Sequence, residues 1–444
     1  MKFASAKKLK MVPLALATFC LVSGGPHGLE PVLGESGITL GLLMIVVIPI
    51  IWALPVALMT AELSAAIPEE GGFYVWVRRA LGPFPGFMCA WLSWLYSIVD
   101  AALYPLLFAK YLSEYISMVQ GHPISNLTQV VVVLFVVILV TGVNLRGIQA
   151  VGKAATYLTA IIVIPFLLMV VKAGISVPHL EPIKLSWGAL SVGLAAALWN
   201  YLGWDNLSTV AAEVENPQKS FPRSLAISIP MVTFVYLLPV LAALRTSPNA
   251  DQWFDGGWAG IATRASAPWI GTLVLLAALA ATSAMFASQM LASSRLPAVL
   301  AEDGYLPRSL AAIHPKWQTP ARSILLCAFC YTCLSWFSFT ELITANVILY
   351  GLSILFEFAA LVVLRVREPN LERPYRVPGG LPVVALLGVL PALLILVVSY
   401  SSVQDEGWLK QIPTAMAIGL GVGVYAFARR RTVVASVAQR EGSA

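Results

Sequence analysis

The sequence contains few charged residues. Only 11% of its 444 residues are Asp, Glu, Lys or Arg, whereas 59% are hydrophobic. A soluble domain carries roughly 25% charged residues, so this composition argues against a large soluble core. No soluble domain or long linker separates the hydrophobic segments. We therefore expect an all-α, polytopic membrane protein.

Cysteine and histidine are also scarce, with five and four residues respectively. Cys327, Cys330 and Cys333 recur every three residues in an apolar segment, which places three small thiols along one helical stripe. This pattern predicts packing, and five cysteines give no disulfide framework. No metal motif, nucleotide-binding loop or nucleophile–base constellation is present. We expect neither a metal nor a cofactor, and no enzymatic activity.

Long hydrophobic segments dominate the chain. Windows of about 20 apolar residues predict transmembrane helices. They give twelve spans near residues 11–36, 38–67, 84–109, 128–146, 154–176, 187–212, 224–245, 268–296, 321–339, 342–364, 381–402 and 411–428.

The basic residues predict the orientation of these spans. Six of the 28 lie on one side, which leaves 22 on the other; the six are Lys110, Lys172, Lys184, Arg245, Arg264 and Lys410. This split predicts cytoplasmic termini in a plasma or inner membrane, and it accounts for the +6 net charge without nucleic acid. An alternative is that the Lys-rich start is a signal peptide. Its removal would leave eleven spans and disturb the agreement with the basic loops.

Two of the hydrophobic segments are interrupted in a similar way. The first breaks at residues 23–28, which include Ser23, Gly24 and Gly25, and the second breaks at residues 199–206. Inside a bilayer an unpaired peptide group costs several kcal/mol, so helices break only where protein or a cavity satisfies the backbone. Paired interruptions in two halves of a chain point to the binding site of a secondary transporter.

The order of the spans predicts an internal repeat. Spans 1–5 (about 11–176) and 6–10 (about 187–364) each open with a broken helix. We expect an inverted five-plus-five repeat with broken helices 1 and 6. Residues 1–364 would form the transport core, and residues 365–444 would add two helices and a cytoplasmic tail.

Three segments carry a resemblance to a known family. Residues 61–83, which include a predicted amphipathic interfacial helix, resemble the signature after helix 2 of the amino acid–polyamine–organocation (APC) superfamily transporters. Residues 213–223 and 294–307 resemble the loops after helices 6 and 8. Residues 23–26, 200–205 and 355–358 are most similar to the plant-type polyamine uptake transporters, with the L-type amino acid transporters as related members. The resemblance implies a secondary transporter that works by alternating access.

The first break offers backbone groups to a substrate. Freed amides of Ser23, Gly24 and Gly25, with the positive end of the next half-helix, favour an anionic group. Freed carbonyls favour an ammonium. His27 titrates near neutral pH in its unperturbed state, so it is a proton-coupling candidate or a polar cavity residue.

The second break offers aromatic residues. The resemblance implies that Trp199 is a lid on the outer side of the substrate. We expect Tyr201 and Trp204 to line the same cavity, where their rings would attract a cation. Gly203 permits close approach of the substrate to the backbone.

The acidic residues that we single out inside the predicted spans are Asp100, Asp205 and Glu357. A carboxylate at a helix centre costs roughly 2.5–3.5 kcal/mol on insertion scales. No Lys or Arg lies at comparable depth, so a cationic substrate or a proton is expected to supply the counter-charge. Asp100 and Glu357 are therefore candidates for amine binding and for proton coupling. Asp205 is either a substrate ligand or the cap of a half-helix.

The coupling ion is predicted only in outline. Some APC members carry a lysine in helix 5, but residues 157–161 contain none, and the nearest is Lys153. A sodium site that uses Ser283 or Ser288 is an alternative to a proton. We expect proton-coupled uptake of a polyamine or an amino acid. A neutral amino acid permease or exchanger, and a nutrient sensor that does not transport, are the alternatives.

Overall fold

The computed structural model describes residues 10–69, 71–146, 151–175 and 180–441. The regular secondary structure in these ranges is helical, and they contain no strand. The first half has α1 (Met11–Val22), α2 (Glu30–Ser36), α3 (Ile38–Ile48), the π-helical turn η1 (Pro49–Ala53), α4 (Leu54–Ala66), α5 (Phe73–Leu81), α6 (Pro83–Gln120), α7 (Asn126–Leu145) and α8 (Val151–Ala173). The second half has η2 (Ala189–Gly193), α9 (Leu194–Trp199), η3 (Asn206–Glu213), α10 (Pro217–Ala243), η4 (Ala250–Gln252), α11 (Trp258–Ala265), α12 (Pro268–Ser293), α13 (Arg295–Glu302), η5 (Arg308–Ala311), α14 (Ala321–Leu334), α15 (Phe339–Arg367), α16 (Gly380–Glu406), η6 (Trp408–Gln411) and α17 (Ile412–Glu441).

Eight helical segments in the described ranges are long and apolar enough to cross a membrane. Four shorter apolar helices accompany them: Met11–Val22, Ala160–Ala173, Ala189–Trp199 and Ala321–Leu334. Each of these segments overlaps a different one of the hydrophobic ranges predicted from the sequence. The two helices that the sequence predicts to be broken are among the short ones, because the interruptions divide them.

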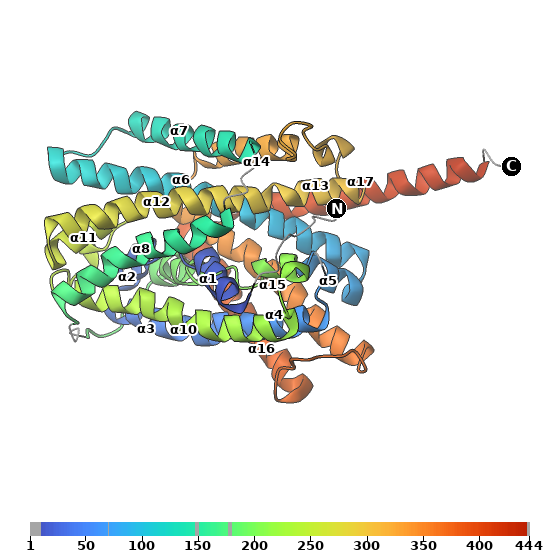
Figure 1. Ribbon diagram of the computed structural model, residues 1–444, viewed down its shortest axis with the longest axis horizontal. Coiled ribbons are helices and arrows are strands. Elements are labelled where there is room, and N and C mark those ends of the chain that lie inside the picture. Colours follow the sequence, from blue (N-terminus) through green and yellow to red (C-terminus); the bar gives the residue numbers. More distant parts are fainter. Residues whose placement is uncertain (1–9, 70, 147–150, 176–179, 442–444) are drawn as a thin grey trace.

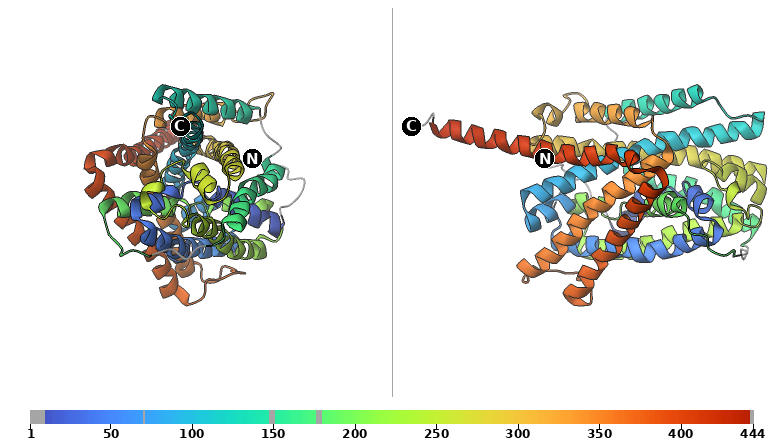
Figure 2. Two further views of the ribbon diagram at one scale, coloured as in Figure 1. Left: turned by 90° about the vertical axis from the view of Figure 1, so that its left-hand side faces the viewer. Right: turned by 180° about the vertical axis from the view of Figure 1, so that it is seen from behind.

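The helices pack side by side into an elongated bundle (Figures 1 and 2). One end carries α2 and α11 and is called the α11 end; the other carries α5 and α13 and is called the α5 end (Figure 1). Helix α6 is buried along most of its length and packs against α12 and α15. Helix α17 extends beyond the bundle at the α5 end (Figure 1).

Helix α6 is longer than the sequence predicts. It contains 38 residues and ends at Gln120, whereas we expected the span to end near residue 109. The cause is Lys110, whose ammonium group forms an ion pair with Asp255 in the segment before α11. A paired cation does not need to leave the helix, so the helix continues beyond the hydrophobic segment.

The predicted amphipathic segment forms α5. Its buried face consists of Phe73, Trp76, Val77 and Ala80. Arg78 and Arg79 lie on the exposed face, where they pair with acidic groups of other segments. The period of these apolar residues explains why this segment is a surface helix at the end of the bundle.

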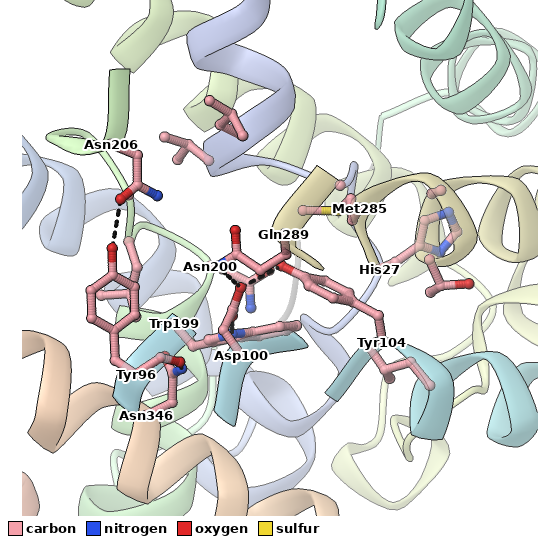
Figure 3. A pocket seen from close by; sticks show the side chains of 18 residues that line it. His27, Tyr96, Asp100, Tyr104, Trp199, Asn200, Asn206, Met285, Gln289 and Asn346 are labelled. Atoms are coloured by element: carbon pink, nitrogen blue, oxygen red, sulfur yellow. Dashed lines mark hydrogen bonds between the residues drawn. The ribbon is translucent and has the colours of Figure 1, made fainter. Parts of the chain in front are cut away.

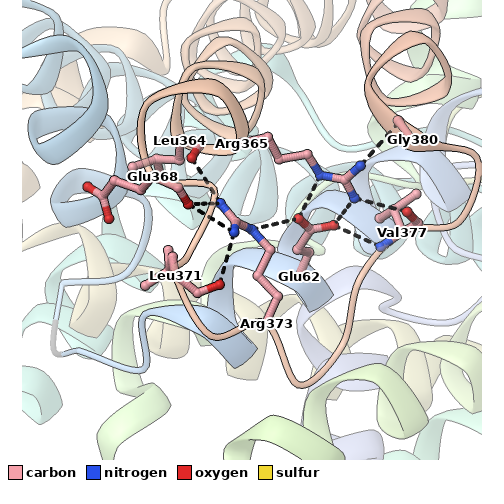
Figure 4. Close-up of polar contacts among 8 residues, drawn as sticks. All are labelled: Glu62, Leu364, Arg365, Glu368, Leu371, Arg373, Val377 and Gly380. Carbon is pink, nitrogen blue, oxygen red and sulfur yellow. Dashed lines mark hydrogen bonds and ion pairs between the residues drawn. The ribbon is translucent and has the colours of Figure 1, made fainter.

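A buried ion cluster joins α4 to α15 at the α5 end (Figure 4). The Glu62 carboxylate is fully buried and accepts hydrogen bonds from both Arg365, whose Nε lies at 2.8 Å, and the Val377 amide at 2.8 Å. Arg373 pairs with the same carboxylate at 3.4 Å. Arg365 also donates to the carbonyls of Val377 and Gly380, which fixes the loop between α15 and α16. Glu62 is therefore an architectural residue that joins α4 to α15.

Candidate functional site

Both predicted interruptions are present, and side chains form hydrogen bonds with backbone carbonyls that the breaks free from helical pairing. The first runs from the end of α1 at Val22 to the start of α2 at Glu30, and the second separates α9 from η3. The Trp258 indole donates to the Pro26 carbonyl at 2.7 Å, and the Asn200 amide donates to the Gly28 carbonyl at 3.0 Å. These bonds supply the partners that a broken helix needs away from water, and the Asn200 bond ties one break to the other.

A cavity of about 40 Å³ lies where the two breaks meet α6, α12 and α15. This volume is the space open to the centre of a water-sized sphere, and on that measure a single water needs roughly 10–15 Å³. The cavity therefore has room for about three waters. Figure 3 shows the Asp100 carboxylate in the middle of the cavity, with His27 on one side and Asn206 on the other. The lining residues are Leu21, Val22, Gly24, His27, Tyr96, Asp100, Tyr104, Leu107, Trp199, Asn200, Leu202, Gly203, Asn206, Ala281, Thr282, Met285, Gln289 and Asn346.

The Asp100 carboxylate accepts three hydrogen bonds from uncharged donors (Figure 3). The Trp199 indole nitrogen donates to Oδ1 at 2.8 Å. The Tyr104 hydroxyl and the Gln289 amide donate to Oδ2 at 3.0 and 2.8 Å. A carboxylate has about four acceptor positions, so one position on Oδ1 stays available. Within the described ranges, no cationic side chain forms a salt bridge with Asp100.

Trp199 is the last residue of α9, and its ring lies against the backbone of the first break. A Cβ atom at Gly28 would stand 2.5 Å from this ring, so only glycine permits the contact. The ring also meets Phe339, the first residue of α15, edge-on at a centroid distance of 5.9 Å. Trp199 therefore separates the cavity from the side on which α15 begins.

His27 lines the cavity with both ring nitrogens unbonded to any described residue. Its ring is 5% exposed and makes edge contacts with Tyr111 and Phe166 at 5.3 and 5.1 Å. Tyr111 also donates to the buried Glu30 carboxyl at 3.0 Å, which places an acid behind the ring. His27 is thus a polar residue of the cavity wall, and its role in proton coupling stays a prediction.

The structure brings together only part of the predicted site. Gly24, His27, Asp100, Trp199 and Gly203 line the cavity. Six other predicted residues do not line it: Ser23, Gly25, Tyr201, Trp204, Asp205 and Glu357.

Two of the amides expected to be free at the first break are occupied. The Ser23 amide donates to the Phe19 carbonyl at 2.7 Å and so closes the last turn of α1. The Gly25 amide donates to the Ser23 hydroxyl at 3.2 Å. The Gly24 amide makes no hydrogen bond to a described residue, so it is the one left of the three.

The two further aromatic residues of the second break point their polar atoms at backbone carbonyls. The Tyr201 hydroxyl donates to Ile45 at 3.0 Å, and the Trp204 indole donates to Tyr201 at 2.9 Å. Both rings are buried in the packing between helices. Trp199 is therefore the aromatic residue of this break that faces the cavity.

Asp205 and Glu357 lie outside the cavity wall, both fully buried or nearly so at 1% and 0% exposed. Asp205 accepts a short hydrogen bond from the Tyr350 hydroxyl, and that hydroxyl accepts from the Gly203 amide at 3.0 Å. Neither carboxylate oxygen of Glu357 has a hydrogen-bond partner among the described residues.

Sequence reasoning missed several polar residues of the site. Gln289 was detectable, because it is the single side-chain amide in its hydrophobic range. Tyr104 lies four residues after Asp100 and hence on the same helical face. The predicted spans also contain Glu30, Glu35 and Glu62. Of these, Glu30 is fully buried and accepts from the Tyr111 hydroxyl and the Gly28 amide at 3.0 and 2.8 Å.

The alternative coupling sites are only partly described. Ser283 donates its hydroxyl to the Leu279 carbonyl at 2.7 Å, within its own helix. The side chain of Lys153 lies outside the part of the structure that is described.

Comparison with known proteins identifies the family. A family model for amino acid permeases matches residues 9–422. The chain belongs to the amino acid permeases of the APC superfamily. This permease is 37% identical over 409 residues to a probable polyamine transporter of Arabidopsis thaliana, across 90% of its own length and 80% of the relative's. It is 37% identical over 404 residues to the polyamine transporter PUT1 of Oryza sativa subsp. japonica, with 89% and 74% covered. The mouse large neutral amino acids transporter small subunit 2 is 27% identical over 390 residues, with 82% and 70% covered.

These relatives confirm the resemblance that the sequence motifs predict. The permease is a multi-pass membrane transport protein, and it is not an enzyme.

Proposed function

We propose that this permease is a secondary active transporter of polyamines that works by alternating access, with proton-coupled uptake. The observation that carries the proposal is Asp100: a buried carboxylate in the cavity between the two breaks, held by neutral donors alone. A buried carboxylate in a membrane helix normally has a cationic partner or lies on a substrate path. An ammonium group of the substrate provides the missing positive charge.

The surroundings of Asp100 suit an extended amine. One ammonium takes the open acceptor position on Oδ1. At the other side of the cavity, the Asn346 side-chain oxygen is buried without a hydrogen-bond partner among the described residues. It is an acceptor for a second amino group, and apolar residues such as Leu21 and Leu107 accommodate the methylene chain.

The cavity must expand to admit such a substrate. Met285 is the first candidate to move, because it lines the cavity and its sulfur packs directly on Gly24 of the first break, 2.4 Å from where a Cβ atom would stand. A methionine side chain is flexible and refits easily. Trp199 is the second, and its departure opens the cavity on the side where α15 begins; this is the movement expected of a lid.

The zwitterionic amino acid is the second candidate, and the first break supports it less well. A substrate carboxylate needs free amides, but of Ser23, Gly24 and Gly25 only Gly24 retains one. The start of α2 is also occupied, since the Gly28 amide already donates to the carboxyl group of Glu30. The relative among the neutral amino acid transporters is nevertheless a reason to test this class.

We place residues 1–364 in the transport core, with two inverted repeats at about 11–176 and 187–364, and residues 365–444 in two appended helices with a tail. The proposed topology has twelve spans and cytoplasmic termini, so the α5 end faces the cytoplasm. Basic residues support this orientation: Arg78, Arg79, Arg365 and Arg373 lie at the α5 end, as the positive-inside rule requires.

The test is direct uptake in proteoliposomes with a panel of putrescine, spermidine and neutral amino acids. We expect uptake of the amines, and Asp100→Asn should weaken it on the order of 10- to 100-fold, since a hydrogen bond to a charged group is worth about 1.5–3 kcal/mol. The matched control is Asp251→Asn, the same change at an exposed aspartate of η4. Uptake of neutral amino acids alone contradicts the polyamine assignment, and specific binding without flux shows a sensor instead of a carrier.

A further inference from the structure

Glu357 is the most unusual carboxyl group in the described bundle. It lies in the C-terminal half of α15 and is fully buried, and neither of its oxygens has a hydrogen-bond partner among the described residues. Buried polar atoms are nearly always satisfied in native proteins. Two unsatisfied oxygens on a single carboxyl group therefore require a ligand or a proton.

Glu357 lies on a polar face of α15, with Ser353 four residues before it and Tyr350 seven residues before it. Tyr350 donates to Asp205, and Ser353 contacts Ser93 of α6 at 2.8 Å. Asp205 and Glu357 therefore border the same buried polar region.

The charged residues of the other elements packed against α15 are engaged or distant. Helix α4 contributes only Glu62, which pairs with Arg365 and Arg373. Arg78 and Arg79 of α5 pair with Asp303 and Glu368 outside the bundle core. Helix α16 carries no charge before Asp405 at its far end, and the remaining charges of α6 are Asp100, Lys110 and Glu114. Arg367, ten residues after Glu357, is exposed and donates to the Ala80 carbonyl at 3.2 Å. Within the described ranges, no arginine or lysine forms a salt bridge with Glu357.

The two neighbouring acids differ in their hydrogen bonds. Asp205 accepts from the Tyr350 hydroxyl, whereas Glu357 accepts from no described group. Two carboxylates that share a buried site without a cation do not both ionise. The donor on Asp205 favours its ionised form, so the proton belongs on Glu357, where an unpartnered negative charge would be far more costly.

Glu357 is separate from the amine cavity but connected to it. It does not line the cavity, and Gly203, which does, donates its amide to the Tyr350 hydroxyl. Tyr350 in turn donates to Asp205. A shift of the second break during substrate binding therefore alters the hydrogen bond that keeps Asp205 ionised, and with it the balance of the proton between the two acids.

We propose that Glu357 is the coupling-proton site of this permease, with Asp205 as its acidic neighbour, and that Asp100 alone holds the substrate ammonium. The inference rests on the proposed transport function. In the cycle, an O–H bond forms on the Glu357 carboxyl from hydronium on one side of the membrane, and it breaks to water on the other. No oxidant or reductant takes part.

The test compares two transport modes of the full chain in proteoliposomes. Counterflow exchanges internal for external radiolabelled putrescine without a gradient, so it needs the amine site but no net movement of protons. Accumulation under an imposed pH gradient needs both sites. Glu357→Gln imitates the permanently protonated acid, so we expect it to retain counterflow and to lose accumulation, whereas Asp100→Asn loses both. Glu302→Gln, at an exposed glutamate of α13, is the matched control.

Three results overturn the proposal. Accumulation of putrescine by Glu357→Gln at the wild-type level shows that the proton binds elsewhere. Loss of counterflow by this variant at wild-type thermal stability places the substrate at Glu357. A wild type that responds to a sodium gradient and not to a pH gradient assigns the site to a different cation. A wild type without any counterflow refutes the proposed function itself, and this outcome is visible before a variant is made.

Discussion

Replacing Glu62 with alanine is expected to destabilise the permease more than any exposed substitution. The change removes the acceptor of two Arg365 hydrogen bonds, the Val377 amide bond and the Arg373 ion pair (Figure 4). It leaves two arginines whose side chains are only 3% and 7% exposed. Breaking one side of a buried ion pair costs about 3–5 kcal/mol, because the remaining charge is uncompensated.

A second variant separates the contribution of the Glu62 charge to the loss of stability from the contribution of its shape. Glu62→Gln retains one acceptor oxygen and nearly the same volume, but it loses the charge that two guanidinium groups share. A hydrogen bond to a charged group contributes about 1.5–3 kcal/mol, so the glutamine variant should fall between alanine and wild type. Glu69→Ala, at an exposed position between α4 and α5, should stay within about 0.5 kcal/mol of wild type.

The assay is the unfolding of purified protein in detergent, followed by tryptophan fluorescence in increasing denaturant. Since membrane proteins often unfold irreversibly, unfolding rates at one denaturant concentration provide the comparison. An alanine variant within about 1 kcal/mol of wild type would refute the reasoning, because a loss that small is incompatible with two buried arginines left without their anion. High salt is expected to change the result little, since buried pairs are poorly screened.

Three further predictions concern other contacts. Gly28→Ala should lower stability and amine affinity, because the new methyl group would lie 2.5 Å from the Trp199 ring at a φ of +87°. The measurements are the thermal unfolding temperature and the amine Kd of the variant, and wild-type values for both would contradict the lid contact. Trp199→Phe removes the indole donor on Asp100 and keeps an aromatic ring, so dissociation of a bound amine should accelerate in a chase experiment, and an unchanged rate would count against it. Arg79 donates to the Glu368 carboxylate at 3.0 and 2.6 Å and lowers its pKa. The stability that this ion pair contributes is therefore present above the ordinary carboxyl pKa and is lost as the pH falls through the lowered pKa. Glu368→Gln should thus unfold at a lower temperature than the wild type at neutral pH and at the same temperature in acid.

The parts of the fold that the sequence predicts are those set by local chemistry. Hydrophobic length gives the helices, and the glycines at residues 24–28 and at 203 give the two breaks, because both signals lie within a few residues. The predicted end of α6 is wrong because it depends on a distant contact: Lys110 pairs with Asp255, which is 145 residues away. No local pattern reveals such a pairing.

The same limit applies to the site. Asp100 is predictable because an acid in an apolar helix is conspicuous, whereas its contact with Gln289 joins residues 189 positions apart. In the second break the backbone is not helical, so no period tells which aromatic residue faces inward. The sequence gives Trp199, Tyr201 and Trp204 the same cavity, and only the fold distinguishes Trp199 from the other two.

The buried acids of this permease differ in how their charge is compensated. That difference separates an acid that holds the fold together from acids suited to bind and release a ligand. Glu62 is bound by two cations, so any change of partner leaves charges unpaired at a cost of several kcal/mol. Asp100 is bound by three neutral donors, each of which contributes about 1.5–3 kcal/mol net. A substrate ammonium can therefore replace or join them with little penalty in either direction. Glu357 has no donor at all among the described residues, which is why we propose a proton as its ligand. In the proposed alternating-access cycle, the Glu62 ion cluster joins helices rigidly while the partners of Asp100 and Glu357 exchange.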